Sequence, residues 1–261
     1  MARGPKKHLK RVNAPSSWHL SKMGGVYATR PAQGPHKMRE SIPLLVILRN
    51  KLNYALNGTE AMKILKEKDN IVTVDKKVRR NPKFPCGLMD VIELEPTNEV
   101  FRVLYDVKKR FILVKIDEKE AEYKLCKIKR KEVGPNKIPY VVTHDGRTLR
   151  FANNDIKVSD TVKLNLNTNE IMGHYKMEVG NLAYIIGGSN KGRVGTITNT
   201  HKFLGAYEIV TLKDVSGKVF TTRMSNVFII GTNKSEITLG KDNGKKLTII
   251  EELELREQNN N

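Results

Sequence analysis

The sequence contains little cysteine. Among its 261 residues only Cys86 and Cys126 occur, 40 positions apart, and neither belongs to a C-x-x-C pair or to a Cys/His pattern. A disulfide framework and a local zinc site are therefore excluded. Two isolated thiols are typical of a protein from a reducing compartment, such as the cytosol or the nucleus.

Long apolar segments are also absent. The longest run, residues 42–48, has seven residues and includes a proline, whereas a membrane-spanning helix needs about 20. The first 13 residues have no apolar core of the kind that a secretory signal carries. We therefore expect no membrane partner and no secretion, and we predict a cytoplasmic protein.

Residues 1–39 lack acidic side chains altogether. They hold nine Lys and Arg, three His and four Pro, without any sustained helical or strand period. Such a segment buries too little apolar surface to fold alone, so we predict an N-terminal extension (1–40) that is disordered when free and binds RNA phosphates. A solubility tail or a nuclear import signal is the alternative. The candidate phosphate ligands are Lys6, Lys7, Lys10, Arg11, Lys22, Arg30, Lys37 and Arg39.

Trp18 is the only tryptophan of the chain and lies within this extension. Its ring is a candidate for stacking on an unpaired RNA base. The alternative is an apolar anchor that holds the extension to the folded body.

Basic residues dominate the chain as a whole. There are 47 Lys and Arg against 28 Asp and Glu, which gives a formal net charge of +19. Charge of this size points to a partner and does not determine the fold. Because the chain has no membrane-spanning segment, nucleic acid is the expected polyanion.

The pattern beyond residue 40 predicts an α+β chain that is mostly β. Leucines at four-residue steps predict a helix over 44–56 that ends at Asn57-Gly58, with Thr59 as the N-cap of a second helix to about residue 68. From residue 71 onward, short β-branched and aromatic runs separated by turn residues predict small barrels, including a hairpin at Asp145-Gly146. The last predicted strand covers residues 246–250.

A second basic region follows the predicted helix pair. Five of the eight residues 76–83 are Lys or Arg, with no acid among them, whereas an ordinary surface intersperses the two signs. Arginine pairs bidentately with phosphate. We predict RNA contacts by this loop and by two cations outside the leucine stripe, namely Arg49, Lys51, Lys76, Lys77, Arg79, Arg80 and Lys83.

Residues 183–197 form a glycine-rich segment. Gly187 and Gly192 have the spacing of a P-loop, but Arg193 and Val194 stand where a P-loop needs Lys and Ser or Thr. The segment instead resembles a KOW motif, a short hairpin of ribosomal and transcription-elongation proteins. A plain hairpin inside a barrel is the alternative. The resemblance implies RNA contacts by four residues at the turn: Asn190, Lys191, Gly192 and Arg193.

Further segments resemble one family. Three segments resemble the S-four-e family of small-subunit ribosomal proteins from eukaryotes and archaea. They are Ser-Ile-Pro-Leu at 41–44 with the helix pair, Val-Asp-Lys-Lys-Val-Arg at 74–79, and Pro-Cys-Gly-Leu-Met-Asp-Val-Ile at 85–92. Lys76 stands where the family usually has glycine. The resemblance extends over essentially the whole chain, through the hairpin at 143–148 to residues 225–249.

The resemblance implies a division of the chain and a role. After the extension come an αL-type RNA-binding domain (41–95), a central β-domain (96–173), and an SH3-like KOW barrel with the C-terminal segment (174–261). The implied function is a structural constituent of the small ribosomal subunit. Its partners would be small-subunit rRNA and neighbouring ribosomal proteins, with nucleolar passage during assembly if the source is eukaryotic.

No catalytic constellation is recognisable. The pair His144-Asp145 lies on a predicted hairpin turn, and no second cluster completes a metal site or a hydrolase site. We therefore expect no enzyme activity, cofactor, metal or small-molecule substrate. The alternatives are an RNA-modifying enzyme that uses the αL-type domain as a clamp, and a free regulatory RNA-binding protein.

Overall fold

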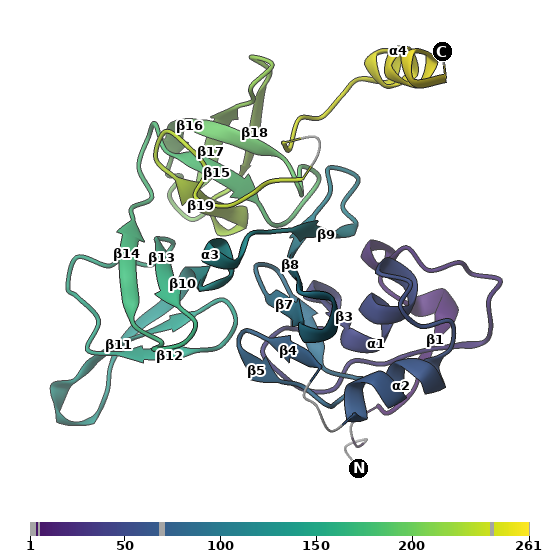
Figure 1. Ribbon diagram of the computed structural model, residues 1–261. Helices are drawn as coiled ribbons and strands as arrows, with labels where there is room; N and C mark the ends of the chain where they lie inside the picture. Colours follow the sequence, from purple (N-terminus) through teal and green to yellow (C-terminus); the bar gives the residue numbers. More distant parts are fainter. Residues whose placement is uncertain (1–3, 5, 68–70, 241–242, 261) are drawn as a thin grey trace.

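Three small β-units surround a common centre in the computed structural model, which describes residue 4 and residues 6–67, 71–240 and 243–260 (Figure 1). Each unit contains one five-stranded sheet whose neighbouring strands are all antiparallel. The predicted α+β, mostly β architecture is confirmed. Of the helices in the described ranges, none is long and apolar enough to span a bilayer.

The first unit is a sheet covered by a helical layer. Its strand order is β5-β4-β7-β8-β9, and β7 pairs with β8 from Val91↔Arg102 to Leu94↔Glu99. The predicted boundary between residues 95 and 96 therefore falls inside this sheet. The strands are β4 (Val72–Val74), β5 (Lys77–Val78), β7 (Val91–Leu94), β8 (Glu99–Tyr105) and β9 (Phe111–Lys115), beside the small pair β3 (Ser41–Pro43) and β6 (Pro85–Gly87).

The helical layer differs from the prediction at its first helix. The helix begins as α1 (Leu44–Val46) and continues as a wider π-helical segment (Ile47–Lys51). It stops before Asn53, which has a left-handed φ of 58°, so Leu56 is 85% exposed and leaves the leucine stripe. The second helix is α2 (Gly58–Lys66). Its N-cap is Asn57, which forms a capping box with Glu60, and not Thr59 as predicted.

The central unit is organised by one long strand. β10 (Tyr123–Val133) pairs with β13 through its first half and with β11 through its second half, and its register shifts between Ile128 and Arg130. The predicted Asp145-Gly146 hairpin is confirmed, because β11 pairs with β12 across it. The other elements are α3 (Glu118–Ala121), β11 (Pro139–Thr143), β12 (Thr148–Arg150), β13 (Thr161–Asn165) and β14 (Ile171–Tyr175).

The third unit is a meander that closes on its first strand. The strand order is β18-β17-β16-β15-β19, so the last strand returns to lie beside the first. Apolar side chains such as Ile185, Ile197 and Ile229 fill its interior. The strands are β15 (Leu182–Ile185), β16 (Val194–His201), β17 (Ile209–Lys213), β18 (Val219–Arg223) and β19 (Val227–Gly231).

The predicted strand at residues 246–250 is wrong. The chain instead ends in helix α4 (Ile249–Asn260). Thr248 and Glu251 cap this helix reciprocally: the Glu251 backbone N–H donates to the Thr248 hydroxyl at 3.3 Å, and the Thr248 N–H donates to the Glu251 carboxylate at 2.8 Å. This Thr-x-x-Glu pattern was a legible helix start in the sequence.

Polar side chains join the third unit to the other two. The Tyr184 hydroxyl accepts a hydrogen bond from the Tyr105 N–H at 2.7 Å and donates one to the Tyr105 carbonyl at 2.6 Å, which connects β15 to β8. Lys127 of β10 donates to backbone carbonyls beside β19, including that of Ser225 at 3.0 Å. Burial lowers the pKa of Lys127 to about 8. The third unit therefore contacts both of the others.

Candidate nucleic-acid interface

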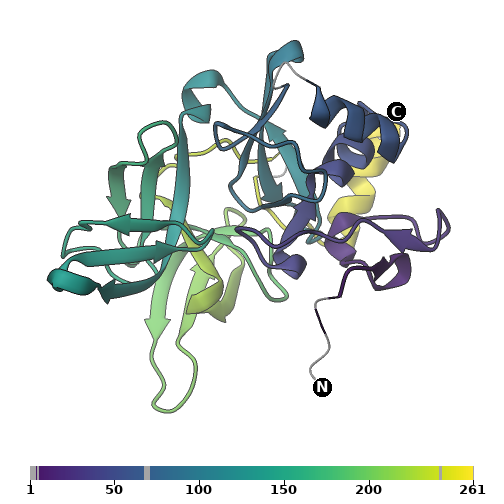
Figure 2. The ribbon, with the colours of Figure 1, turned by 90° about the horizontal axis from the view of Figure 1, so that it is seen from below.

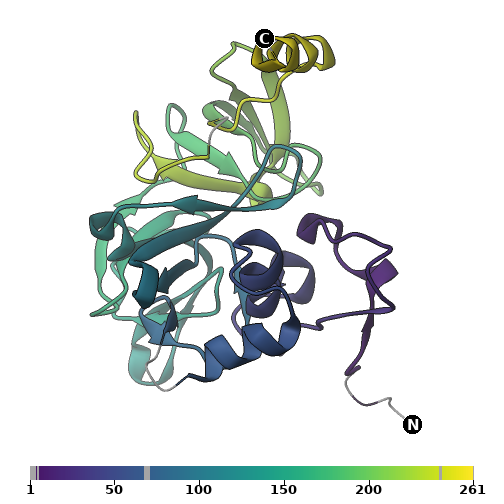
Figure 3. The ribbon, with the colours of Figure 1, turned by 45° about the vertical axis from the view of Figure 1, so that its right-hand side comes forward.

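Residues 6–40 of the N-terminal segment are ordered and lie along the side of the helical layer (Figure 3), whereas residues 1–3 and 5 lie outside the described residues. A short pair, β1 (Leu9–Lys10) and β2 (Tyr27–Ala28), holds its two ends together. Trp18 is fully buried in the core of the first unit, and its indole Nε1 donates to the Ser41 carbonyl at 2.6 Å. The predicted disorder is therefore wrong. The segment folds because the body supplies the apolar surface that it lacks itself.

Burial of Trp18 also corrects its predicted role. An indole with no exposed surface and a satisfied N–H cannot stack on a base without leaving the core. The anchor alternative is the one that the structure supports. Arg11 is likewise occupied within the segment, since its guanidinium donates to the Ser21 carbonyl.

Two adjoining clefts open between this segment and the body. The first has a volume of about 970 Å³ and the second about 720 Å³, and Lys6 and Arg30 line both. Among the residues that the structure describes, no Asp or Glu lines either cleft. Cations from four parts of the chain meet here: Lys6, Lys7, Lys10, Arg30, Lys37, Arg39, Lys83, Lys109 and Lys191.

Further cations repel one another near these clefts. Arg110 in the β8–β9 turn lowers the pKa of His19, with smaller effects from burial and from Lys51. Burial and then Arg110 lower the pKa of Lys51, which Asp106 only partly offsets. Burial and Arg11 lower the pKa of Arg49. Neighbouring cations repel one another, and an anion bound between them would reduce this repulsion.

The basic loop 76–83 divides into exposed and occupied side chains. Lys77 and Lys83 are exposed. Lys76 pairs with Glu93 at 2.5 Å, and the Arg79 guanidinium lies 4.5 Å from the centre of the Phe84 ring. Lys76 has a φ of 60°, so it adopts the left-handed conformation for which the family usually has glycine.

The C-terminal part of the glycine-rich loop, at Gly192 and Arg193, is buried. A Cβ on Gly192 would overlap the Asp106 carbonyl oxygen of the β8–β9 turn, so this loop packs directly on the first unit. Lys191 lies 3.4 Å from the centre of the Tyr105 ring, and burial lowers its pKa to about 8. Arg193 is 7% exposed and pairs with Asp214 at 3.1 Å. Arg193 is therefore enclosed and paired, and its side chain does not project beside that of Lys191.

Of the four residues predicted to contact RNA at this turn, Asn190 and Lys191 are half-buried, whereas Gly192 and Arg193 are buried. Lys191 reaches the rim of the first cleft. Asn190 is held by bonds to Arg193 and to the Thr221 carbonyl, at 3.3 and 3.2 Å. The loop thus contributes one cation to the cleft and otherwise joins two units.

A buried ion cluster joins the first and central units, and no feature of the sequence had indicated it. Lys124 of β10 is fully buried, with its ammonium 2.8 Å from Asp75, 2.5 Å from Asp90 and 3.1 Å from Asp145. Arg147 pairs with Asp75 at 2.6 Å and with Asp145 at 2.9 Å. Burial opposes the charge on Lys124, but the three carboxylates raise its pKa well above the ordinary value.

Comparisons with known proteins agree along the chain. Three family models match: "Ribosomal family S4e" over residues 97–171, "RS4NT (NUC023) domain" over residues 3–39, and "40S ribosomal protein S4 C-terminus" over residues 214–260. The "small ribosomal subunit protein eS4" of Bombyx mori is 53% identical over 257 residues, which cover 98% of this chain and 97% of that protein. The chain belongs to the ribosomal protein family S4e.

Other members of the S4e family are similar across the same length. The eS4 protein of Tetrahymena thermophila is 52% identical over 96% of this chain and 97% of its own, and eS4A of Schizosaccharomyces pombe is 52% identical over 98% and 97%. The crystal structure of the 30S ribosomal protein S4e from Thermoplasma acidophilum superposes with a TM-score of 0.63. It is 34% identical and covers 74% of this chain and 96% of that one.

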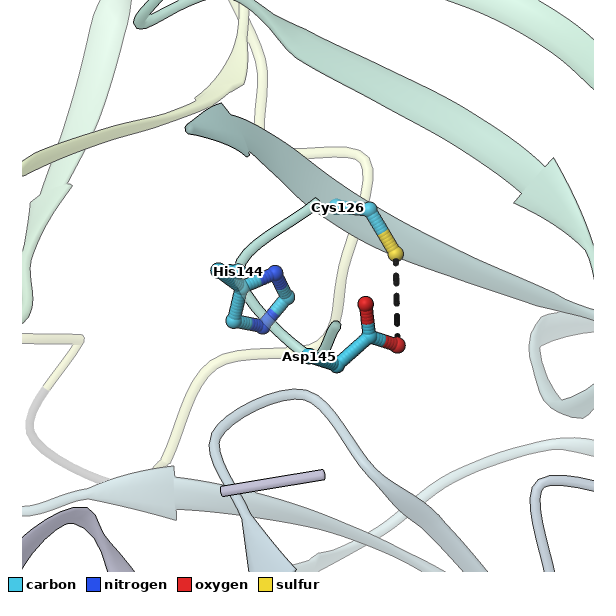
Figure 4. Close-up of side chains that lie close together, drawn as sticks. All are labelled: Cys126, His144 and Asp145. Carbon is cyan, nitrogen blue, oxygen red and sulfur yellow. Dashed lines mark hydrogen bonds between the residues drawn. The ribbon is translucent and has the colours of Figure 1, made fainter. Parts of the chain in front are cut away.

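Within the described part of this S4e chain, one group of side chains has the composition of a metal site. Cys126, His144 and Asp145 offer ligand atoms within 4.8 Å of one another (Figure 4). Both His144 ring nitrogens are already used, however: Nε2 lies 3.2 Å from the Leu88 carbonyl, and Nδ1 is 3.3 Å from the Lys127 N–H. Burial raises the pKa of the Cys126 thiol well above its ordinary value.

The third potential ligand, Asp145, is already paired with Lys124. Burial disfavours its charge, but Lys124 and other neighbours hold the pKa of this carboxyl well below the ordinary range. A protonated thiol, a saturated imidazole and a paired carboxylate do not make a ligand set for a divalent cation. Through Asp145, this group is instead part of the ion cluster around Lys124.

Proposed function

We propose that this member of the S4e family, a structural constituent of the small ribosomal subunit, holds ribosomal RNA at the two basic clefts. The observation that carries the proposal is the lining of the clefts, nine cations without an acid. Phosphates of an RNA strand neutralise such a surface and release counterions. Lys83 of the basic loop is one of these nine cations, and Lys77 of the same loop is exposed.

The shape of the region supports backbone recognition. Phosphate contacts position a protein on RNA, while the folded surface recognises helix geometry. Ordered clefts present their cations in fixed positions, so less conformational entropy is lost on binding than from a disordered tail. We propose rRNA of the small subunit as the partner, together with neighbouring ribosomal proteins, and a cytoplasmic location on the ribosome with nucleolar passage if the source is eukaryotic.

A structural role in the subunit requires no catalysis, so we propose that the chain is not an enzyme. In the pair His144-Asp145, both ring nitrogens of His144 contact backbone groups. A methyl-transfer assay and a pseudouridylation assay with bound RNA test the point. Turnover in either would establish the RNA-modifying alternative.

The cleft is tested by removing three exposed cations, Lys6, Lys10 and Arg39, as alanines. The slope of log affinity against log salt for an rRNA fragment should become shallower by about 2–3, since each phosphate contact contributes about 0.7–0.9. The matched control removes the exposed Lys157, Lys176 and Lys234 and changes the net charge equally. Equal slopes for the two variants would show that RNA does not lie in the cleft.

A further inference from the structure

The third unit presents a second kind of surface, at the end of β16 that faces away from the first unit. The glycine-rich loop precedes β16 and packs on the β8–β9 turn. The hairpin that follows β16 extends away from the barrel, as the long light-green hairpin in Figure 2. Any contact between this unit and RNA requires an exposed surface, and the β16–β17 hairpin provides such a surface.

The hairpin carries exposed rings that its own fold does not require. Phe203 is 50% exposed, Tyr207 is 66% exposed and Leu204 is fully exposed. A soluble protein seldom leaves several large apolar side chains together in solvent without a partner for them. The rings of His201 and Phe203 are 6.3 Å apart and inclined by 30°, so they already lie as a loose stack.

Cations accompany these rings. The guanidinium of Arg223, on the neighbouring strand β18, lies 4.0 Å from the centre of the Tyr207 ring. Glu208 is the only acid between residues 194 and 213, and Lys202 pairs with it at 3.5 Å. Exposed aromatic faces, one of them covered by a guanidinium plane, are the kind of surface on which single-stranded bases stack.

We propose that the β16–β17 hairpin is a base-stacking site for unpaired nucleotides of RNA, with Phe203 and Tyr207 as the platforms and Arg223 extending the second. The proposal rests on the proposed function, since it assumes an RNA partner. It adds a site of different chemistry: the clefts bind the charged backbone, and the hairpin binds the faces of bases that are not paired. The recognised feature of the RNA is therefore a loop, bulge or strand end.

The test uses the full chain and two probes at about 200 mM salt, where the phosphate contribution is weakened. One probe is a single-stranded RNA of about 10 nucleotides, within the site size of single-strand binders, with a central 2-aminopurine whose fluorescence falls on stacking. The other is the same sequence as a duplex, whose bases are not available.

The double variant Phe203→Ala, Tyr207→Ala should bind the single strand more weakly, by roughly fivefold to 150-fold for each stacked base. It should also abolish the fluorescence quenching. Duplex affinity should not change. The conservative exchange Phe203→Tyr with Tyr207→Phe keeps both rings and should keep the quenching. Leu204→Ser, at the same tip, should leave both probes unaffected.

Unchanged single-strand affinity and quenching in the double alanine variant would overturn the inference. An equal loss for Leu204→Ser would overturn it too, because it would indicate a general apolar contact of the kind that a protein partner makes. Neither result bears on the proposal that RNA binds in the clefts. That proposal would fail if the Lys6, Lys10 and Arg39 variant had an unaltered salt slope.

Discussion

The basic residues of this chain fall into two regions that behave in opposite ways. In the joint between the first and central units, the Lys124 ammonium is enclosed and touches three carboxylates. In the clefts of the N-terminal segment, nine cations are gathered with no acid among the lining residues. The cations behind the formal charge of +19 therefore serve two different purposes. Paired and enclosed cations hold the fold, and open ones are available to a partner.

The strongest test of the joint is Lys124→Met. Removing the ammonium leaves Asp75, Asp90 and Asp145 close together with less positive charge to balance them, which we expect to cost about 3–5 kcal/mol of unfolding free energy. Denaturant unfolding followed by circular dichroism measures it. Lys129→Met changes an exposed lysine of the same strand and should stay within about 0.5 kcal/mol of the parent. A Lys124 variant as stable as the Lys129 variant would remove the distinction between the two regions.

The pH dependence of stability provides a second test of the joint. Burial lowers the pKa of His144 to about 4, against an ordinary value of 6.5. The folded protein therefore binds fewer protons than the unfolded chain between these values, and stability falls as the pH drops from about 6.5 toward 4, by up to about 3 kcal/mol. Unfolding at a series of pH values should show that the fall is reduced in His144→Gln and retained in His201→Gln, which alters an exposed ring.

The packing of the glycine-rich loop is tested with two glycines of similar backbone conformation. Gly192 has a φ of 88° and Gly217 a φ of 80°, so alanine at either position adopts a strained left-handed conformation. A Cβ at Gly217 meets nothing closer than 4.0 Å, whereas one at Gly192 overlaps the Asp106 carbonyl. Gly192→Ala should therefore cost about 1–3 kcal/mol more than Gly217→Ala in thermal unfolding. Equal costs would mean that the loop does not rest on the first unit.

The smallest expected effect is on the fluorescence of Trp18. As the only tryptophan, and a fully buried one, it should emit at short wavelength and remain shielded from acrylamide when saturating rRNA fragment is added. Strong quenching by RNA would instead return Trp18 to the nucleic-acid interface and weaken the division between structural and binding residues.

Local patterns in the sequence predicted much of the fold. Alternating apolar residues indicated most strands from residue 72 onward, and Asp145-Gly146 indicated its hairpin, because both signals come from neighbouring residues. The leucine stripe failed beyond Leu52, since four-residue spacing alone does not reveal that the chain turns at Asn53. The helix at 249–260 was missed because the β-branched pair Ile249-Ile250 was interpreted as part of a strand, and the Thr248–Glu251 cap was overlooked.

The candidate site was predicted by composition and not by geometry. Exposed cations of the N-terminal segment and of loop 76–83 were identifiable because their charge is unbalanced in sequence. Arg193 was not distinguishable from them, since its partner Asp214 is 21 residues away. The Lys124 cluster was invisible for the same reason, because its carboxylates come from separate turns brought together only by the fold.

The contacts among the three β-units have a consequence for assembly. The first unit is joined to the central one through Lys124, the central to the third through Lys127, and the third to the first through Tyr184. A closed triangle has no free hinge, so opening one joint strains the other two. In the proposed complex with rRNA, docking of one unit would therefore deliver the remaining two already aligned, and the search for their binding positions would become intramolecular.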